Sequence, residues 1–180
     1  MSLDIISDTV CLISSDNKIF SVNKEACKIS NFIKDVLEND NETENINLNI
    51  NGEYLDYIVK FIKMYHEEPY DYKTYDHPLG IFLSGDHDVS YCLPQKYAEF
   101  SNFSGKTKDF VFNMLNEVGT LHIEPLEHTL VVQISSWFKN KSEKEIEEIF
   151  SNVTKEEHAR LREEATVEAN AEIESKREKI

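Results

Sequence analysis

The chain has 180 residues, with 19 Lys and Arg against 34 Asp and Glu, which gives a net charge of −15. This length fits one domain, or one domain with an extension. The acidity excludes a nucleic-acid backbone or an anionic membrane as the main partner, and no apolar run approaches the roughly 18 residues of a membrane span.

Two runs of apolar and β-branched residues, Thr9–Ser14 and Lys18–Val22, flank the turn-forming residues Ser15, Asp16 and Asn17. Such runs around polar residues that tolerate a tight turn are typical of two paired strands. The sequence therefore predicts that a β-hairpin opens the fold.

The next element is predicted to be one helix with Asn23 as its N-cap. Ala26, Ile29, Ile33 and Leu37 recur at three- and four-residue spacing, as on one buried helix face. Apolar residues then alternate with asparagines over 46–50, which predicts a half-buried third strand. A second amphipathic helix follows from residue 52 and stops near Pro69.

Residues 70–104 show neither a helical nor a strand period and contain two of the four prolines. We expect a long insertion or connecting loop here, with one short strand at Ile81–Leu83. From Lys108 the helical spacing returns and ends near Gly119. Pro125 then fits the first turn of a further helix, whose apolar residues predict burial nearly all round.

The last 41 residues, 140–180, are predicted to be helical. Asn140 or Ser142 could cap a short helix that carries apolar residues, and Thr154 with Glu157 forms a capping-box pattern. That pattern opens a run to Ile180 without glycine or proline. The apolar stripe of this last helix is thin, so the exposed apolar residues before it are expected to bind a partner.

The sequence contains only weak matches to phosphate-binding and metal-binding motifs. Gly105-Lys106-Thr107 resembles the end of a phosphate-binding loop, but Phe100 occupies the position where that loop needs its first glycine. His77, His87 and Cys92 could hold a metal only if the insertion folds around it. We therefore expect no catalytic residue, cofactor or metal. The three cysteines and the first residues suggest neither a disulfide framework nor a secretory signal, so we expect the cytoplasm, the nucleus or both.

Six segments together resemble a known family in their order and spacing. They are Cys11–Asn23, Ile29–Glu38, Tyr65–Pro69, Leu121–Leu126, Asn140–Phe150 and Thr154–Glu164. The family is that of the Skp-type F-box adaptors of cullin–RING ubiquitin ligases (S-phase kinase-associated proteins), which are built on a BTB/POZ domain. The resemblance covers most of the chain except residues 70–94.

The resemblance implies an α+β fold: a BTB/POZ domain with a small three-stranded sheet and flanking helices, plus a C-terminal helical extension that binds F-box proteins. The expected parts are the N-terminal part of the BTB/POZ domain at 1–69, the divergent insertion at 70–104, the C-terminal helices of that domain at 105–139 and the extension at 140–180.

The resemblance also implies an adaptor that is not an enzyme and that joins the N-terminal domain of a cullin to F-box substrate receptors, for ubiquitin-dependent degradation. The residues expected at the cullin are Val118, Gly119, Thr120, Leu121 and Glu124. Those expected at the F-box are Trp137, Ile146, Ile149, Phe150, Val153, Leu161, Ala165 and Val167. Gly119-Thr120 replaces the family's Asn-Tyr pair at the cullin contact.

The alternative is a BTB/POZ assembly module that self-associates, for example as a homodimer, and has no ligase role. Binding of F-box proteins would favour the adaptor, and self-association alone would favour the assembly module.

Overall fold

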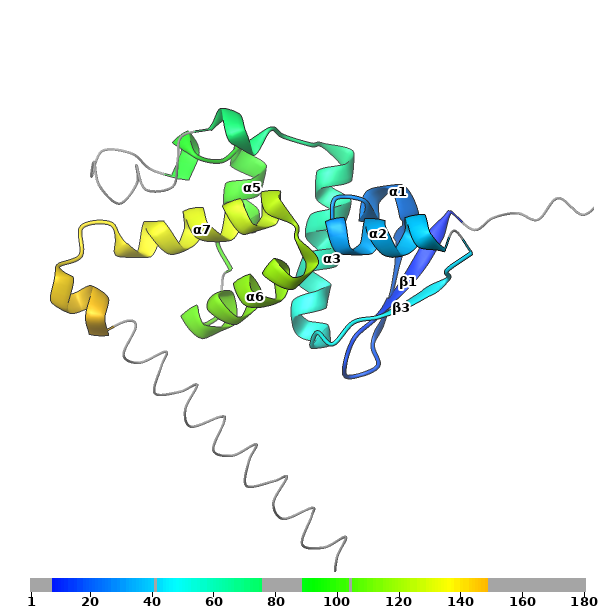
Figure 1. Cartoon of the computed structure of the whole chain (residues 1–180). Coiled ribbons are helices and arrows are strands. Elements are labelled where there is room, and N and C mark those ends of the chain that lie inside the picture. Colours follow the sequence, from blue (N-terminus) through cyan, green and yellow to red (C-terminus); the bar gives the residue numbers. More distant parts are fainter. Residues whose placement is uncertain (1–7, 41, 76–88, 104, 149–180) are drawn as a thin grey trace, which may run out of the picture. The chain divides into compact units, whose positions relative to one another are not determined.

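A computed structural model describes residues 8–40, 42–75, 89–103 and 105–148, and the structural statements below concern those residues (Figure 1). One compact unit ends at Lys139 and a second begins at Asn140, and each is described by itself. The strand predicted at Ile81–Leu83 and the helix predicted from Thr154 lie outside the described residues.

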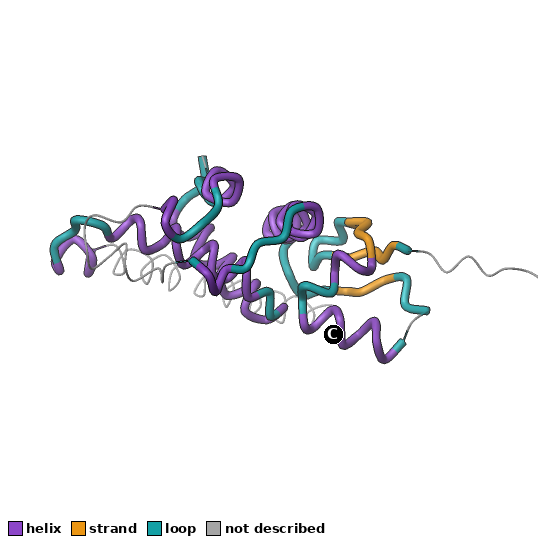
Figure 2. The backbone as a smooth tube through the Cα atoms, turned by 90° about the horizontal axis from the view of Figure 1, so that it is seen from above, coloured by secondary structure: helices purple, strands orange, loops and turns teal. Residues whose placement is uncertain are grey.

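The predicted hairpin is confirmed. Strands β1 (Thr9–Ile13) and β2 (Ile19–Asn23) pair antiparallel, with Leu12 opposite Phe20. Strand β3 (Asn45–Asn47) pairs parallel with β1, so the sheet order is β2-β1-β3. In the view from above, the three strands gather at one side of the long helix that follows them (Figure 2).

The third strand is shorter than predicted, but its side chains alternate as expected. Ile46, Leu48 and Ile50 are all buried, and the asparagines between them are exposed. The backbone of Leu48 donates to the carbonyl oxygen of Ile13 at 2.8 Å. The segment after β3 therefore continues along β1 toward the hairpin turn.

The hairpin turn is attached to the start of the next long helix by the Asp16 carboxylate. Asn17 adopts φ 61°, a left-handed conformation that Asn tolerates. Asp16 Oδ1 accepts hydrogen bonds from Ser14 Oγ and from the Gly52 amide, each at 2.7 Å. Lys18 Nζ lies 2.9 Å from Asp16 Oδ2. A Cβ at Gly52 would lie 2.6 Å from Asp16 Oδ1, so this approach requires glycine.

The single helix predicted after Asn23 is instead two helices, which corrects that prediction. Helix α1 (Lys24–Cys27) begins at the predicted cap, since the Asn23 side chain accepts from two backbone amides. Helix α2 (Asn31–Asn39) begins at its own cap, Ser30, whose side chain accepts from the Ile33 amide. The apolar spacing continues across the break between α1 and α2, so this spacing could not reveal the break.

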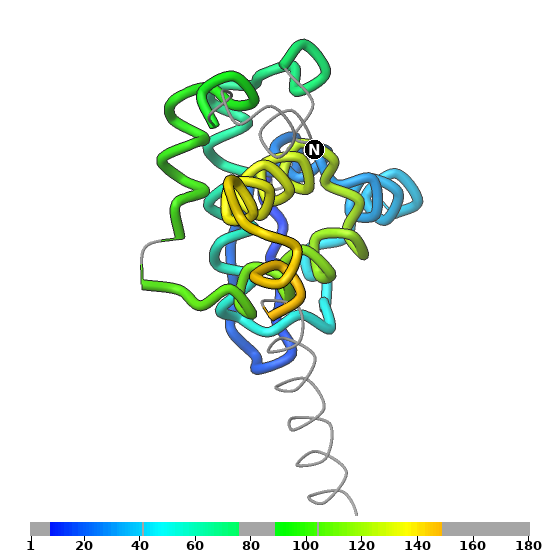
Figure 3. The backbone as a smooth tube through the Cα atoms, turned by 90° about the vertical axis from the view of Figure 1, so that its left-hand side faces the viewer, coloured from blue at the N-terminus to red at the C-terminus, as the bar shows by residue number. Residues whose placement is uncertain are grey.

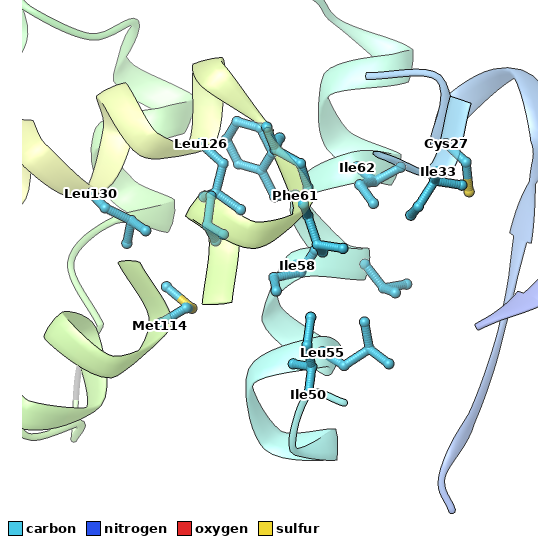
Figure 4. Close-up of a cluster of buried hydrophobic side chains, with 14 of the residues drawn as sticks. Cys27, Ile33, Ile50, Leu55, Ile58, Phe61, Ile62, Met114, Leu126 and Leu130 are labelled. Carbon is cyan, nitrogen blue, oxygen red and sulfur yellow. The ribbon is translucent and has the colours of Figure 1, made fainter. Parts of the chain in front are cut away.

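Helix α3 (Gly52–Glu67) lies at the centre of the first unit, between the sheet with α1 and α2 on one side and the later helices on the other (Figures 1 and 4). Asn51 caps it, as a polar residue before an amphipathic run should. Its buried side chains belong to both halves of the core, and they include Leu55, Ile58, Val59, Phe61 and Ile62.

Helices α6 (Lys108–Leu121) and α7 (Glu124–Phe138) lie against each other (Figure 3). Pro125 stands in the first turn of α7, as predicted. Of the residues of α7, only Glu124 and Val131 are exposed, so the expectation that this helix is buried nearly all round is confirmed.

The described parts of 70–104 are not a plain loop, which is a second correction. They contain two short 3-10 helices, η1 (Tyr72–Thr74) and η2 (Val89–Tyr91), and helix α5 (Gln95–Phe100). Aromatic side chains hold α5 on α3, where the Phe61 and Tyr97 ring centroids lie 5.6 Å apart. The Tyr70 and Tyr97 rings have centroids 4.3 Å apart, and both residues are buried.

The hydroxyls of these buried tyrosines have partners, so the cluster carries little desolvation cost. Tyr97 donates to the carbonyl oxygen of Glu68 at 2.6 Å. The Tyr70 hydroxyl lies 3.0 Å from Thr129 Oγ1 on α7, and burial raises the pKa of Tyr70. The segment that begins at residue 70 is thereby fastened to α7.

We predict that Asp16→Asn lowers the midpoint of thermal unfolding by a few degrees at neutral pH. The hydrogen bond from Ser14, then the Lys18 ammonium, holds the pKa of Asp16 well below its usual range. A depressed folded-state pKa contributes stability above the unfolded value of about 4, and this stability is lost as the pH falls toward the folded value.

The difference between parent and variant should therefore shrink as the pH is lowered below about 4. Scanning calorimetry across pH is the measurement. Asp35→Asn, at an exposed acid on α2, is the matched control. A difference that persists unchanged at acid pH would contradict the assignment.

Candidate partner-binding surface

The turn between α6 and α7 carries the residues predicted to meet a cullin. His122 ends α6 in a left-handed conformation, φ 50° and ψ 58°, and its amide donates to the Gly119 carbonyl oxygen at 3.3 Å. Ile123 is fully buried beside it, and α7 starts at Glu124. A tight turn with one buried residue fixes the end of α6 and the start of α7 relative to each other.

Ser30 attaches this turn to the N-terminal half of the unit. Its hydroxyl donates to the Leu121 carbonyl oxygen at 2.6 Å and accepts from the Ile33 amide at 3.1 Å. The Asn31 amide donates to the His122 carbonyl oxygen at 3.3 Å. Ser30 is fully buried, so these bonds are shielded from water. The start of α2 thus determines where α6 ends.

The predicted cullin residues divide into two groups. Thr120 and Glu124 are exposed, and Gly119 is half-buried with open space where a Cβ would stand. Val118 and Leu121 are 0% and 2% exposed, so they pack in the core and cannot contact a partner directly. Their part of the prediction is corrected: these side chains hold α6 in place.

Glu124 has neighbours that the sequence did not reveal. The Tyr72 hydroxyl donates to Glu124 Oε2, and this hydrogen bond raises the pKa of Tyr72. The Lys73 ammonium lies 5.4 Å from the centre of the Tyr72 ring, and the His128 ring lies 5.6 Å from it. Tyr72 and Lys73 belong to η1, and Tyr72 is 52 residues from Glu124, so no local pattern connects them.

The residues predicted for the F-box fall at the end of the described chain. Trp137 is half-buried near the end of α7, with its ring 6.0 Å from that of Phe112 and 5.9 Å from Lys108 Nζ. Ile146 is half-buried on the helix described over 143–148. The other predicted F-box residues, Ile149, Phe150, Val153, Leu161, Ala165 and Val167, lie outside the described residues.

The helix that carries Ile146 begins with a capping box. The Ser142 amide donates to Glu145 Oε2 at 2.8 Å, and the Glu145 amide donates back to Ser142 Oγ at 3.4 Å. Of the two predicted caps, Ser142 is therefore the one used, and its bond holds the pKa of Glu145 below its usual range.

The cysteines and histidines of the described residues give no sign of a reactive or metal-binding site. Burial raises the pKa of the Cys27 thiol to about 12, so it stays protonated at neutral pH. Cys92 is fully buried, and His77 and His87 lie outside the described residues. Within the described ranges, no group of three or more His, Cys, Asp or Glu could hold a metal ion. No helix of the described part is long and apolar enough to span a membrane.

Comparison with known families gives one match. Residues 8–67, which run from the start of the sheet through α3, match the tetramerisation domain of the Skp1 family. A comparison with curated proteins gives no significant match. The family match and the three-stranded sheet with flanking helices confirm the predicted α+β, POZ-type fold with a helical extension.

We predict that Ser30→Ala lowers the free energy of unfolding by about 1–3 kcal/mol, because it removes a helix cap and leaves the buried Leu121 carbonyl without this donor. Urea unfolding followed by Trp137 fluorescence and circular dichroism measures the change. Ser21→Ala, at an exposed position of β2, should stay within about 0.5 kcal/mol of the parent. Equal effects of the two substitutions would contradict the role of Ser30.

Proposed function

From the match of residues 8–67 to the tetramerisation domain of the Skp1 family, we propose that the chain is a Skp1-type adaptor subunit of a cullin–RING ubiquitin ligase. In this role it joins a cullin N-terminal domain to F-box substrate receptors and performs no chemistry itself. The observation that carries the proposal is the family match, which covers β1 to α3, the part onto which α6 packs.

The turn between α6 and α7 supports the cullin half of the proposal. Thr120 and Glu124 are exposed on either side of it, and Ser30 holds the turn to the matched domain. A surface held on a rigid support loses little entropy when a partner docks. The net charge of −15 favours a partner with a basic surface.

The F-box half of the proposal is supported by one residue at the end of α7 and one on the helix described over 143–148. Trp137 and Ile146 are only half-buried although both are large and apolar. Partly exposed apolar side chains of this size are typical anchors of protein interfaces. We propose that each of these two residues contributes to F-box binding. We place the protein in the cytoplasm, the nucleus or both, and its three free cysteines are consistent with a reducing compartment.

The rival, a self-associating module, has one observation in its favour. Strand β2 is an edge of the sheet, and Ile19 on it is 66% exposed. Light scattering coupled to size-exclusion chromatography distinguishes the adaptor from the self-associating module. The adaptor predicts a 1:1:1 complex when the full chain is mixed with a cullin N-terminal fragment and an F-box protein from the same organism. A homo-oligomer that binds neither partner would overturn the proposal.

We predict that Gly119→Asn combined with Thr120→Tyr tightens cullin binding by up to about thirtyfold and leaves F-box binding unchanged. An aromatic residue at an interface typically contributes 2 kcal/mol or more, and the chain has open space beside Gly119 for the added side chain. Titration calorimetry against a cullin N-terminal fragment measures the change. No gain in the double variant would show that the cullin is reached through other residues.

We predict that Ile146→Asp weakens F-box binding at least tenfold, because burying an apolar side chain of this size contributes about 1.5–3 kcal/mol. Glu147→Gln, at an exposed position of the same helix, is the matched control and should bind as the parent does. Circular dichroism checks that both variants fold. Parent-like binding by Ile146→Asp would remove this helix from the F-box surface.

A further inference from the structure

Two open grooves meet at a ridge formed by Tyr72, Lys73 and Glu124. The first groove runs between α1, the end of α3, η1 and the start of α7, and the second runs along α7. The floor of the first groove is apolar, and it includes Ala26, Ile29, Tyr65, Pro69, Tyr70 and Pro125.

The rim of the first groove is acidic. It carries the carboxylates of Glu25, Asp71 and Glu124 against one lysine, Lys73, and the groove is also lined by His66 and His122. Glu25 is paired with Lys28 at 2.6 Å, whereas Asp71 and Glu124 have no ion pair within the described ranges. The negative charge near the ridge is therefore concentrated at Asp71 and Glu124.

An apolar floor beside two carboxylates that share one lysine restricts what can occupy the groove. A purely apolar segment would remove water from the two carboxylates without replacing their hydrogen bonds, and an acidic segment would be repelled. Lysine and arginine side chains satisfy both features, because their aliphatic stems cover apolar surface while their charged ends reach acceptors.

We propose that this groove receives a lysine or arginine side chain of the cullin, with its stem on the apolar floor and its charge beside Asp71 and Glu124. The proposal rests on the proposed adaptor function, and it extends the cullin surface from the turn between α6 and α7 onto η1. The link is Glu124, which belongs both to the predicted cullin residues and to the ridge.

The test uses two neighbouring substitutions of opposite sign in the full chain. Asp71→Asn removes a negative charge and keeps a side-chain oxygen that can accept from the Lys73 amide, as Asp71 Oδ1 does at 3.0 Å. Lys73→Gln removes the only positive charge on the ridge. Against a cullin N-terminal fragment, Asp71→Asn should weaken binding about two- to fivefold and Lys73→Gln should tighten it by a similar factor.

Both effects should shrink between low and high salt, because they are electrostatic. Glu38→Gln, at an exposed acid of α2 outside the groove, has the same charge change as Asp71→Asn and should not alter binding. Effects of the same sign for Asp71→Asn and Lys73→Gln, or an equal effect of Glu38→Gln, would overturn the groove proposal.

The outcomes also separate the groove from the function. If the parent binds the cullin fragment and the groove variants bind equally well, the groove proposal fails and the adaptor function stands. If the parent does not bind the fragment, both are overturned.

Discussion

The position of α6 relative to the N-terminal half of the unit depends on the hydrogen bonds of the Ser30 hydroxyl. This hydroxyl starts α2 by accepting from the Ile33 amide, and it receives the end of α6 by donating to the Leu121 carbonyl oxygen. Together with the Asn31 amide, this buried hydroxyl therefore joins the region that matches the Skp1 family to the helices that follow it. Because a buried hydroxyl with both bonds satisfied tolerates little displacement, the turn after α6 is held in one place.

The aromatic cluster extends this arrangement to the segment that departs most from the family. Tyr97 and Tyr70 pack on each other, and Tyr70 reaches Thr129 on α7. Two residues after Tyr70, the Tyr72 hydroxyl meets the Glu124 carboxylate. A segment without any recognisable motif thus lies beside the turn that the family resemblance assigns to the cullin, and it adds acidic and aromatic groups to that surface.

Local signals in the sequence predicted the elements whose causes are local. The hairpin turn at Asp16 and the caps at Asn23 and Ser142 depend on residues within a few positions, so single-sequence reasoning could find them. The cluster around Tyr97 depends on partners far along the chain, and periodicity alone could not show it. The break before α2 has a local cap at Ser30, but the apolar spacing continues across the break and hides it. For α5, aromatic residues three apart after a proline were a signal that could have indicated a short helix.

Hydrogen exchange by mass spectrometry tests most directly whether the turn between α6 and α7 is the cullin surface. The full chain is labelled with and without a cullin N-terminal fragment from the same organism, and exchange is compared across the digest. The account predicts slower exchange in the complex over residues 118–125 and 71–75. Unchanged exchange in both segments, with protection only along β2, would contradict it and would favour an assembly through the sheet edge.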